Sequence, residues 1–466
     1  MKLSKIKAPD TFFIIFSILF IVAILTWIIP GGEYSRVIVD GKEFVESNSF
    51  RYVESNPQGI AEVLISPMKG FIDAALIIGF VLLVGGAFGV FKRTEAIDSA
   101  IIAVAKAHKK SKAVRIMLIP LFMILFSLAG GIFGMSEEVI PFILVFVPMA
   151  LMLGYDTVTG VAIPFVAAGA GFAGAFLNPF TVGIAQNIAQ LQLFSGMEYR
   201  IICWVIITST AIFFVIRYAN RVKKNPELSI TYLSDQEKRK NINYSDVENH
   251  KAISLNHKFV LFTFLLGILI LILGVLYFNW YIEEISAIFL TLGILVGVVG
   301  RLSIKEITDS FISGAKDLVG TALIIALARG ILILSRDGKI IDTMLHTLSD
   351  PISSLHPIIS SQAMFVVQTL INFFVPSGSG QAVLTMPIMA PLSDIVGVSR
   401  QTAVLAFQLG DGFSNMIIPT SAVTMGVLTL ADIPWEKWAR WILPLEIVFL
   451  IIGFLLLIPP NLIGWQ

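Results

Sequence analysis

Four charged residues lie within stretches that are otherwise apolar. Glu137 and Glu138 occupy the polar centre of one stretch, in the run GMSEE at 134–138, while Asp411 and Arg329 lie in two others. Because a charge inside a membrane is costly, such residues are usually functional. The three acids could bind a cationic ligand group or a proton. Arg329 could bind a substrate carboxylate or pair with one of the acids, and a purely structural ion pair is the alternative for each residue.

Small and polar residues also gather in four short runs that interrupt apolar sequence. The runs are GMSEE at 134–138, GAGFAGAFLNPF at 169–180, PSGSGQ at 376–381 and GDGFSNMIIPTS at 410–421. Glycine lets the backbone approach a ligand closely, and Pro179 and Pro419 free carbonyl groups because proline lacks a donor. Freed carbonyls with Ser, Thr or Asn oxygens could hold Na⁺, and the N-termini of half-helices could hold a carboxylate.

These runs and charges supply the candidate residues for binding a substrate or an ion. The candidates are Ser136, Glu137, Glu138, Asn178, Pro179, Arg329, Ser377, Ser379, Gln381, Asp411, Asn415, Thr420 and Ser421. The alternative is that small residues only let helices pack closely. Matched positions in the two halves of the chain favour a binding site. Na⁺ could bind at the tips through ligands that the sequence does not identify, Na⁺ or H⁺ is the candidate coupling ion, and no cofactor is expected.

Composition places the chain in a lipid bilayer and argues against an enzyme. Of 466 residues, 56% are hydrophobic and 14% are charged, and the net charge of +1 does not indicate a nucleic-acid partner. The five histidines lack metal-binding spacing, no ATP-binding glycine loop is present, and the single Cys203 excludes an intrachain disulfide. We therefore expect a small-molecule substrate and no catalysis.

The apolar stretches that position these residues predict an all-α polytopic membrane protein. A helix needs about 20 apolar residues to cross the hydrocarbon core. Ordinary spans are predicted at 12–30, 70–91, 200–217, 259–278, 285–300, 317–335 and 440–459. The longer stretches 157–190 and 401–431 predict helices that break midway. Segments 113–154 and 357–397, with two apolar arms around a polar centre, predict re-entrant hairpins, so that about nine spans accompany two hairpins.

The two halves of the chain match in order, which predicts an internal repeat. Gly70, Asp73 and Gly86 fall on Gly314, Asp317 and Gly330, Ser136 falls on Ser379, and Gly171 falls on Gly412. The predicted units are a first repeat at 1–217, a linker at 218–256 and a second repeat with one extra span at 257–466. Because the two hairpins would enter from opposite sides, the repeats are expected to be inverted, as in alternating-access transporters.

Loop charges predict the orientation in the membrane. Residues 92–115 carry seven Lys or Arg and residues 217–258 carry nine, whereas the loop 31–69 has more acids than bases. Lys and Arg near span ends are retained in the cytoplasm. We expect a multi-pass protein of a bacterial inner membrane, with a cytoplasmic N-terminus and a C-terminus outside.

The motifs GMSEEVIPF, FLNPFTVGIAQ, VPSGSGQAVLTMPIMAPL and GDGFSNMIIPTSAV together resemble the YfcC-type family of the ion transporter superfamily. The resemblance covers nearly the whole chain, including TWIIPGGEY and Arg329. Members are described as basic amino acid antiporters and are similar to C4-dicarboxylate carriers and arginine/ornithine antiporters. The resemblance implies a scaffold domain that forms a homodimer and a transport domain that moves in an elevator manner. Ser136 departs from the Gly expected in relatives and adds a hydroxyl at the tip.

Three functions are compatible with these residues. The paired acids favour a secondary transporter of basic amino acids that exchanges arginine for ornithine. Arg329 and the Ser- and Asn-rich tips would also suit a Na⁺- or H⁺-coupled transporter of dicarboxylates or short-chain carboxylates. A passive channel would need a polar stripe along its pore, whereas the polar groups here converge on the middle of the membrane.

Overall fold

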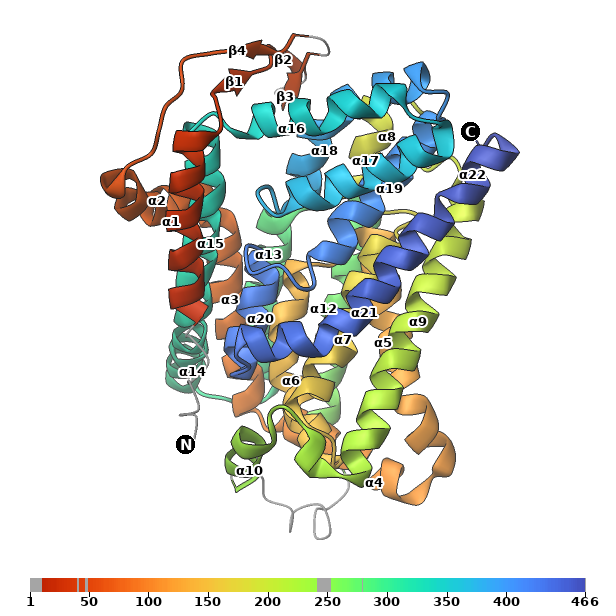
Figure 1. Ribbon diagram of the computed structural model, residues 1–466. Helices are drawn as coiled ribbons and strands as arrows, with labels where there is room; N and C mark the ends of the chain where they lie inside the picture. The colour runs from red at the N-terminus through yellow and green to blue at the C-terminus, as the bar shows by residue number, and fades with distance from the viewer. Residues whose placement is uncertain (1–10, 40–41, 47–48, 241–252, 279, 466) are drawn as a thin grey trace, which may run out of the picture.

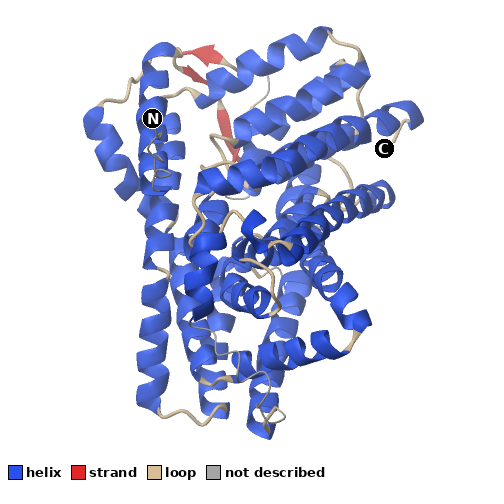
Figure 2. Ribbon diagram, turned by 60° about the horizontal axis from the view of Figure 1, so that its bottom comes forward, coloured by secondary structure: helices blue, strands red, loops and turns tan. Residues whose placement is uncertain are grey.

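The computed structural model describes residues 11–39, 42–46, 49–240, 253–278 and 280–465, and the described chain is almost entirely helical (Figures 1 and 2). Seven described helices are long and apolar enough to cross a membrane. The prediction of an all-α polytopic membrane protein is therefore confirmed. The strands of the described residues form two small antiparallel pairs at one end, β1 (Gly32–Glu33) with β4 (Arg51–Tyr52) and β2 (Arg36–Val39) with β3 (Lys42–Val45).

Each ordinary span predicted from hydropathy coincides with a helix. The helices are α1 (Thr11–Ile28), α3 (Ala75–Arg93), α9 (Met197–Lys224), α12 (Leu255–Phe278), α13 (Ile282–Val299), α15 (Val319–Asp337) and α21 (Trp435–Leu456). All but α1 meet the length and composition of a membrane span, and α5, expected as one arm of a hairpin, meets them too.

The polar runs interrupt helices at the expected places. The first pair of antiparallel arms is α5 (Lys112–Phe133) with η1 (Glu137–Phe142) and α6 (Ile143–Met152), and the second is α17 (Pro357–Asn372) with α18 (Gly378–Ile395). The first broken helix comprises α7 (Thr157–Ala173), η2 (Pro179–Gly183) and α8 (Ile184–Ile188), and the second comprises α19 (Arg400–Ser414) and α20 (Ala422–Ala431).

Local chemistry explains where these helices stop and restart. Gly134 ends α5 with a left-handed φ of 73°, which glycine adopts without strain. After the breaks, Asn178, Ser377 and Ser421 each accept a backbone N–H of the following helix. Such caps satisfy donors that a helix start leaves free. The tips are therefore built to leave backbone groups unwound between capped helices.

Several short elements escape the hydropathy prediction. The helices α2 (Ile60–Asp73) and α14 (Ile304–Asp317) directly precede α3 and α15, and α2 begins inside the segment 31–69 that is expected as a loop and ends inside the expected span 70–91. Each has only 14 residues, which is short of the length that a span needs. The expected linker also holds helix, because α9 continues to Lys224. The remaining short helices are α4 (Ala96–Lys110), η3 (Pro226–Leu228), α10 (Tyr232–Lys240), α16 (Ile341–Ser349), η4 (Asp350–Ser354) and α22 (Ile458–Ile463).

Glycines matched between the two halves lie at equivalent helix crossings. A Cβ on Gly70 would lie 2.3 Å from the Ala326 carbonyl oxygen, where α2 crosses α15. A Cβ on Gly314 would lie 2.2 Å from the Gly85 carbonyl oxygen, where α14 crosses α3. Gly85 is matched to Arg329, three residues beyond Ala326, so the two crossings are displaced from each other by about one helical turn.

The helices pack as two groups that meet along a narrow boundary. We call α1, α2, α3, α12, α13, α14 and α15 the scaffold group, because they contact one another extensively. The arms and the broken helices form the second group, in which α5 packs on α7, α17 on α19, and α7 on α19. The groups meet mainly where α15 contacts α20 and where α3 contacts η1.

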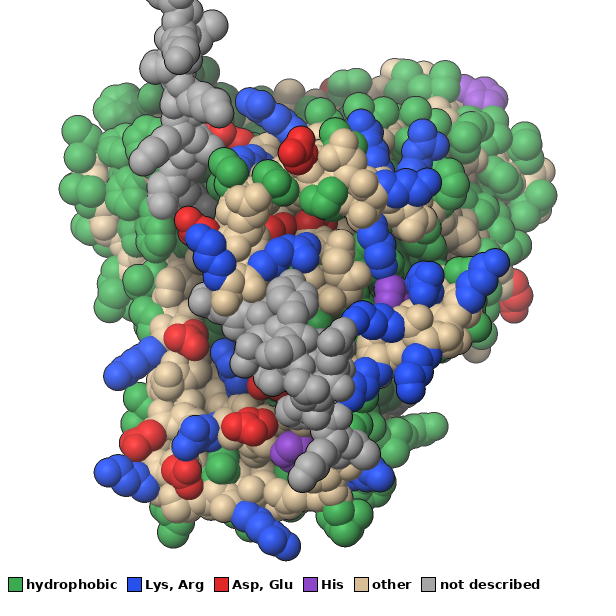
Figure 3. Space-filling view, turned by 90° about the horizontal axis from the view of Figure 1, so that it is seen from below, with side chains coloured by type: hydrophobic (Ala, Val, Ile, Leu, Met, Phe, Trp, Pro, Cys, Tyr) green, Lys and Arg blue, Asp and Glu red, His purple; other side chains and the backbone are tan. Residues whose placement is uncertain are grey.

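One end of the molecule is rich in basic side chains. The strands lie at one end, whereas α4 and α10 lie at the other (Figure 1). Viewed from the α4 and α10 end, the surface carries many Lys and Arg side chains (Figure 3). The first pair of arms begins near α4 and the second begins near α16, which lies at the strand end (Figure 1).

Replacing Gly171 by alanine is expected to destabilise the second group. The added methyl would lie 1.9 Å from the Ser127 carbonyl oxygen of α5, so the two helices would have to separate. Overpacking of this kind costs about 1–3 kcal/mol. Thermal unfolding in detergent should show a lower midpoint for Gly171→Ala. The matched control is Gly79→Ala, whose methyl meets no atom within 4 Å, and an equal midpoint for both variants would contradict this account.

Candidate functional site

Residues from both tips and both breaks line one cavity of about 290 Å³. The four polar runs, separate in sequence, therefore converge. The predicted candidates that line this central cavity are Ser136, Glu137, Glu138, Arg329, Ser377, Ser379, Asn415, Thr420 and Ser421. Since polar groups within an apolar protein need partners or a ligand, their convergence around a hollow indicates a binding site.

The first tip presents two adjacent carboxylates to the central cavity. Glu137 and Glu138 begin η1, directly after the left-handed turn at Gly134. The Ser136 backbone N–H donates to Glu138 Oε2 at 3.0 Å. This bond holds Glu138 against the tip, and the cavity receives negative charge from both side chains.

The second tip presents the start of a long helix to the same cavity. Ser377 is the N-cap of α18, and its Oγ accepts the Gly380 N–H at 3.4 Å. The first N–H groups of an α-helix carry partial positive charge and attract anions. Ser379 lines the cavity beside this helix start. The two tips thus offer opposite electrostatic character to one cavity.

Arg329 forms an ion pair with Asp73, which is not among the predicted candidate residues. Its Nε donates to Asp73 Oδ2, and both side chains are about a quarter exposed, at 25% and 24%. Arg336 Nη1 lies 3.7 Å from Asp73 Oδ1. The structure therefore pairs Arg329 with Asp73 rather than with Glu137, Glu138 or Asp411. The only sequence signal for Asp73 was its repeat match to Asp317.

Four predicted candidates lie behind the cavity wall. Asn178 is buried, and its Oδ1 accepts the Phe180 N–H at 2.9 Å. Pro179 follows it as the first residue of η2. Gln381 donates to the Gln368 side-chain oxygen at 2.7 Å, inside the second pair of arms. Asp411 is fully buried and accepts one hydrogen bond from Asn415.

The scaffold group supplies a residue that sequence reasoning missed. Tyr281, just before α13, lines the central cavity, and its ring lies 4.9 Å from that of Phe180. Ser379 lines the same cavity. No motif marks Tyr281, because its position depends on how the α12–α13 turn packs against the second group.

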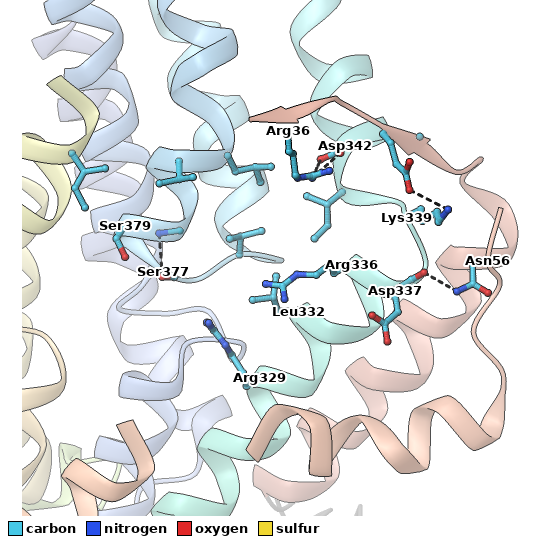
Figure 4. A pocket seen from close by; sticks show the side chains of 18 of the residues that line it. Arg36, Asn56, Arg329, Leu332, Arg336, Asp337, Lys339, Asp342, Ser377 and Ser379 are labelled. Carbon is cyan, nitrogen blue, oxygen red and sulfur yellow. Dashed lines mark hydrogen bonds and ion pairs between the residues drawn. The ribbon is translucent and has the colours of Figure 1, made fainter. Parts of the chain in front are cut away.

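A larger vestibule of about 1070 Å³ leads from the central cavity toward the strand end. The two hollows share Phe180, Tyr281, Arg329, Ser377 and Ser379. Figure 4 shows the Arg329 side chain pointing toward the tip that carries Ser377 and Ser379. Solvent at the strand end therefore has a route to the second tip.

Charged side chains along the vestibule are largely paired with one another. Arg36 contacts Asp342 at 2.8 Å, and Lys339 contacts Glu33 at 3.0 Å. Asn56 Nδ2 donates to the Asp337 carbonyl oxygen at 2.9 Å (Figure 4). These contacts join the strand segment to the end of α15 and the start of α16. The vestibule wall is therefore held in place by ion pairs and hydrogen bonds between its own side chains.

A cysteine at Ser379 should report occupancy of the cavity. Ser379 lines both hollows, so Ser379→Cys is expected to react with a water-soluble thiol reagent and to be protected by bound substrate. The native Cys203 is fully buried and should contribute little background. Labelling with and without substrate measures the protection. Ser353→Cys, at an exposed position on η4, is the control that substrate should not protect; absence of protection at Ser379 by every substrate would count against this tip.

Comparisons with known proteins agree with this architecture. The family model for the C4-dicarboxylate anaerobic carrier matches residues 8–460. A protein of Escherichia coli (strain K12) named "Putative basic amino acid antiporter YfcC" is 35% identical, covering 98% of this chain and 97% of its own length. An uncharacterized protein of Haemophilus influenzae is 31% identical with the same coverage.

Solved transporter structures resemble the chain more distantly. The Alcanivorax borkumensis YdaH transporter has 15% identity and a TM-score of 0.46 over 98% of this chain and 99% of its own. Neisseria gonorrhoeae MtrF has 16% identity and a TM-score of 0.43 over 97% and 95%. From the family model and the close relatives, the chain belongs to the C4-dicarboxylate anaerobic carrier family, as a YfcC-type multi-pass membrane transporter.

Proposed function

We propose that this transporter exchanges basic amino acids, arginine for ornithine, across the cell membrane. The observation that carries the proposal is the charge balance of the central cavity. Its charged lining residues are Asp73, Glu137, Glu138 and Arg329. Because Asp73 pairs with Arg329, the carboxylates of Glu137 and Glu138 are left to attract a cation.

The remaining features of the cavity suit the other end of an amino acid. The N-terminus of α18, capped by Ser377, would receive the α-carboxylate, while Glu137 and Glu138 would receive the cationic side chain. A cavity of about 290 Å³ is at the small end of ligand pockets, which span about 300–1,000 Å³. That size supports a free amino acid rather than a peptide.

Alternating access of the elevator type would move the cavity between the two sides. The narrow boundary between the scaffold group and the second group supports such a movement. In this arrangement the tips are those of re-entrant hairpins in two inverted repeats, and the vestibule is the outward route. The basic α4 and α10 end would face the cytoplasm of a bacterium, with the N-terminus inside and the C-terminus outside, and scaffold groups of two copies would form a homodimer.

Counterflow in proteoliposomes tests the exchange directly. Vesicles preloaded with arginine, ornithine, lysine or succinate would be diluted into labelled arginine, with and without Na⁺. Internal ornithine or arginine should drive uptake, whereas internal succinate should not. An uptake rate that does not depend on the internal solute would contradict exchange and would instead favour a passive channel.

A dicarboxylate is the second candidate substrate. It is favoured by the description of the matching family model and by Arg329, which lines both hollows. In that case Arg329 would leave Asp73 to bind a substrate carboxylate. Na⁺- or H⁺-dependent succinate uptake, without arginine exchange, would establish this alternative.

A further inference from the structure

Basic side chains gather at the corner where α4 turns into α5. α4 ends with His108, Lys109 and Lys110, and α5 begins with Lys112. Arg115 lies one turn later, where its Nε donates to the His108 carbonyl oxygen at 3.4 Å and its Nη2 to the Lys109 carbonyl oxygen at 3.1 Å. The last carbonyl groups of a helix lack helical partners and attract cations, so Arg115 holds this corner together.

The end of α9 brings Lys223 to the same corner. Its Nζ lies 3.4 Å from His108 Nε2 and 4.3 Å from the centre of the Tyr155 ring. Because an ammonium group only donates, His108 Nε2 accepts this bond, which requires a neutral ring. Burial lowers the pKa of His108 to about 4, and the charges of Lys223 and Arg115 contribute to that shift. Both cations therefore lie near one buried histidine.

Arg115 and Lys223 have no acidic partner among the described residues. The ion pairs found there include neither of these two bases. Lys110, Lys112 and Arg115 are exposed, and Lys223 is half-buried. Like charges that are held together repel one another, and an anion that binds among them removes this cost. We call Lys110, Lys112, Arg115 and Lys223 the basic corner, at which positive charge lacks compensation within the described chain.

The surface that adjoins the basic corner is apolar. Ile116, Met117 and Leu121 follow Arg115 on α5, and their exposed fractions are 58%, 54% and 51%. Since α5 is long and apolar enough to cross a membrane, these side chains would face acyl chains. The basic corner then lies at the level where lipid headgroups begin. Figure 3 shows how many Lys and Arg side chains cover this end of the molecule.

We infer that the basic corner binds the phosphate headgroup of an anionic phospholipid, whose acyl chains lie along the exposed face of α5. Clusters of Lys and Arg beside a membrane helix attract acidic headgroups, and the planar guanidinium of Arg115 suits phosphate oxygens. A zwitterionic headgroup would bring a cation of its own to a place that lacks anions. The apolar face favours a lipid over soluble phosphate, because it offers the acyl chains a surface to pack on.

The position of the basic corner gives a bound lipid a structural role. α4 contacts α3 and α12 of the scaffold group, and it also contacts α5 and α6 of the second group. α4 is therefore a connection between the two groups at this end of the molecule. A headgroup that bridges the start of α5 and the end of α9 would fix the α4–α5 corner. This role does not depend on which substrate is transported.

Lipid binding to the purified full-length protein tests the inference. Phosphatidylglycerol or phosphatidylcholine would be titrated into the protein in neutral detergent, and native mass spectrometry would count the bound lipids. Wild type should retain phosphatidylglycerol in preference to phosphatidylcholine. Arg115→Gln/Lys223→Gln should lower the retention of phosphatidylglycerol on the order of tenfold, because two headgroup contacts are lost. Arg115 also holds α4, so Lys223→Gln alone, which leaves the bonds of Arg115 intact, should lower the retention by a smaller factor.

The matched control is Lys69→Gln/Arg93→Gln, which changes the net charge by the same amount. Both of these bases are ion-paired, Lys69 with Asp337 and Arg93 with Glu306, so this variant should retain phosphatidylglycerol as wild type does. Equal retention of the two phospholipids by wild type would overturn the inference. Equal losses in the control and in Arg115→Gln/Lys223→Gln would reduce the effect to net charge and would also overturn it. Displacement of the lipid by millimolar inorganic phosphate would make the corner a site for a soluble anion instead.

Discussion

Neutralising either carboxylate of the first tip should abolish arginine exchange. Glu137 and Glu138 line the central cavity, and within the described residues neither forms an ion pair with a base, since Arg329 pairs with Asp73. Removing one member of a buried charge pair costs about 2–5 kcal/mol. Exchange by Glu137→Gln or Glu138→Gln should therefore fall by at least about 30-fold. Initial rates of labelled arginine counterflow, at several concentrations, measure the loss.

The shape of these side chains is retained in both variants, so folding and insertion should be unaffected. Glu283→Gln is the matched control. Glu283 is an exposed carboxylate two residues after Tyr281, and Glu283 itself lines neither hollow. It should transport like wild type. Wild-type exchange by both tip variants would remove the basis for a cationic substrate at this tip.

Convergence of the four polar runs was predictable from sequence because few places in a membrane protein tolerate unwound polar backbone. Runs such as PSGSGQ in long apolar stretches have to meet protein groups or water. The repeat matches strengthened that expectation, since Ser136 and Ser379 occupy equivalent tips. The fold class and the location of the cavity could therefore be predicted from composition and hydropathy.

Pair contacts between distant helices were not predictable in the same way. Arg329 and Asp73 are separated by 256 positions, and the three acids considered as partners of Arg329 did not include Asp73. Tyr281 enters the site only through the packing of a turn. The helices α2 and α14 escaped prediction because each has only 14 residues, fewer than a membrane span needs. Each of these features depends on tertiary packing rather than on local sequence.

The charge balance of the cavity links the pairing of Arg329 to substrate choice. A guanidinium held by Asp73 leaves the first tip negative, whereas a free guanidinium in the same small cavity would neutralise it. Asp73 would then act as a positioning residue for specificity without touching the substrate. Its removal should change the preferred substrate charge, and the direction of that change is testable.

Asp73→Asn is expected to impair arginine exchange through Arg329. Once released, the Arg329 guanidinium can pair with Glu137 or Glu138 and compete with the substrate cation. The KM for arginine should rise about 10- to 100-fold, equivalent to about 1.4–2.8 kcal/mol. Counterflow over a range of arginine concentrations separates this rise in KM from a loss of folded protein, which would lower only the maximal rate.

The double variant Asp73→Asn/Arg329→Gln decides whether the released charge is responsible. Because the double variant has no free guanidinium at the cavity, its KM for arginine should return to within a few-fold of the wild-type value. A double-mutant cycle detects such coupling between the two residues. Arg329→Gln alone should also retain exchange, because Arg336 lies 3.7 Å from Asp73 and can compensate it. Equal impairment of the single and double variants would refute the shielding of Arg329 by Asp73. Loss of all uptake in Arg329→Gln would instead make Arg329 a substrate contact, as a dicarboxylate transporter requires.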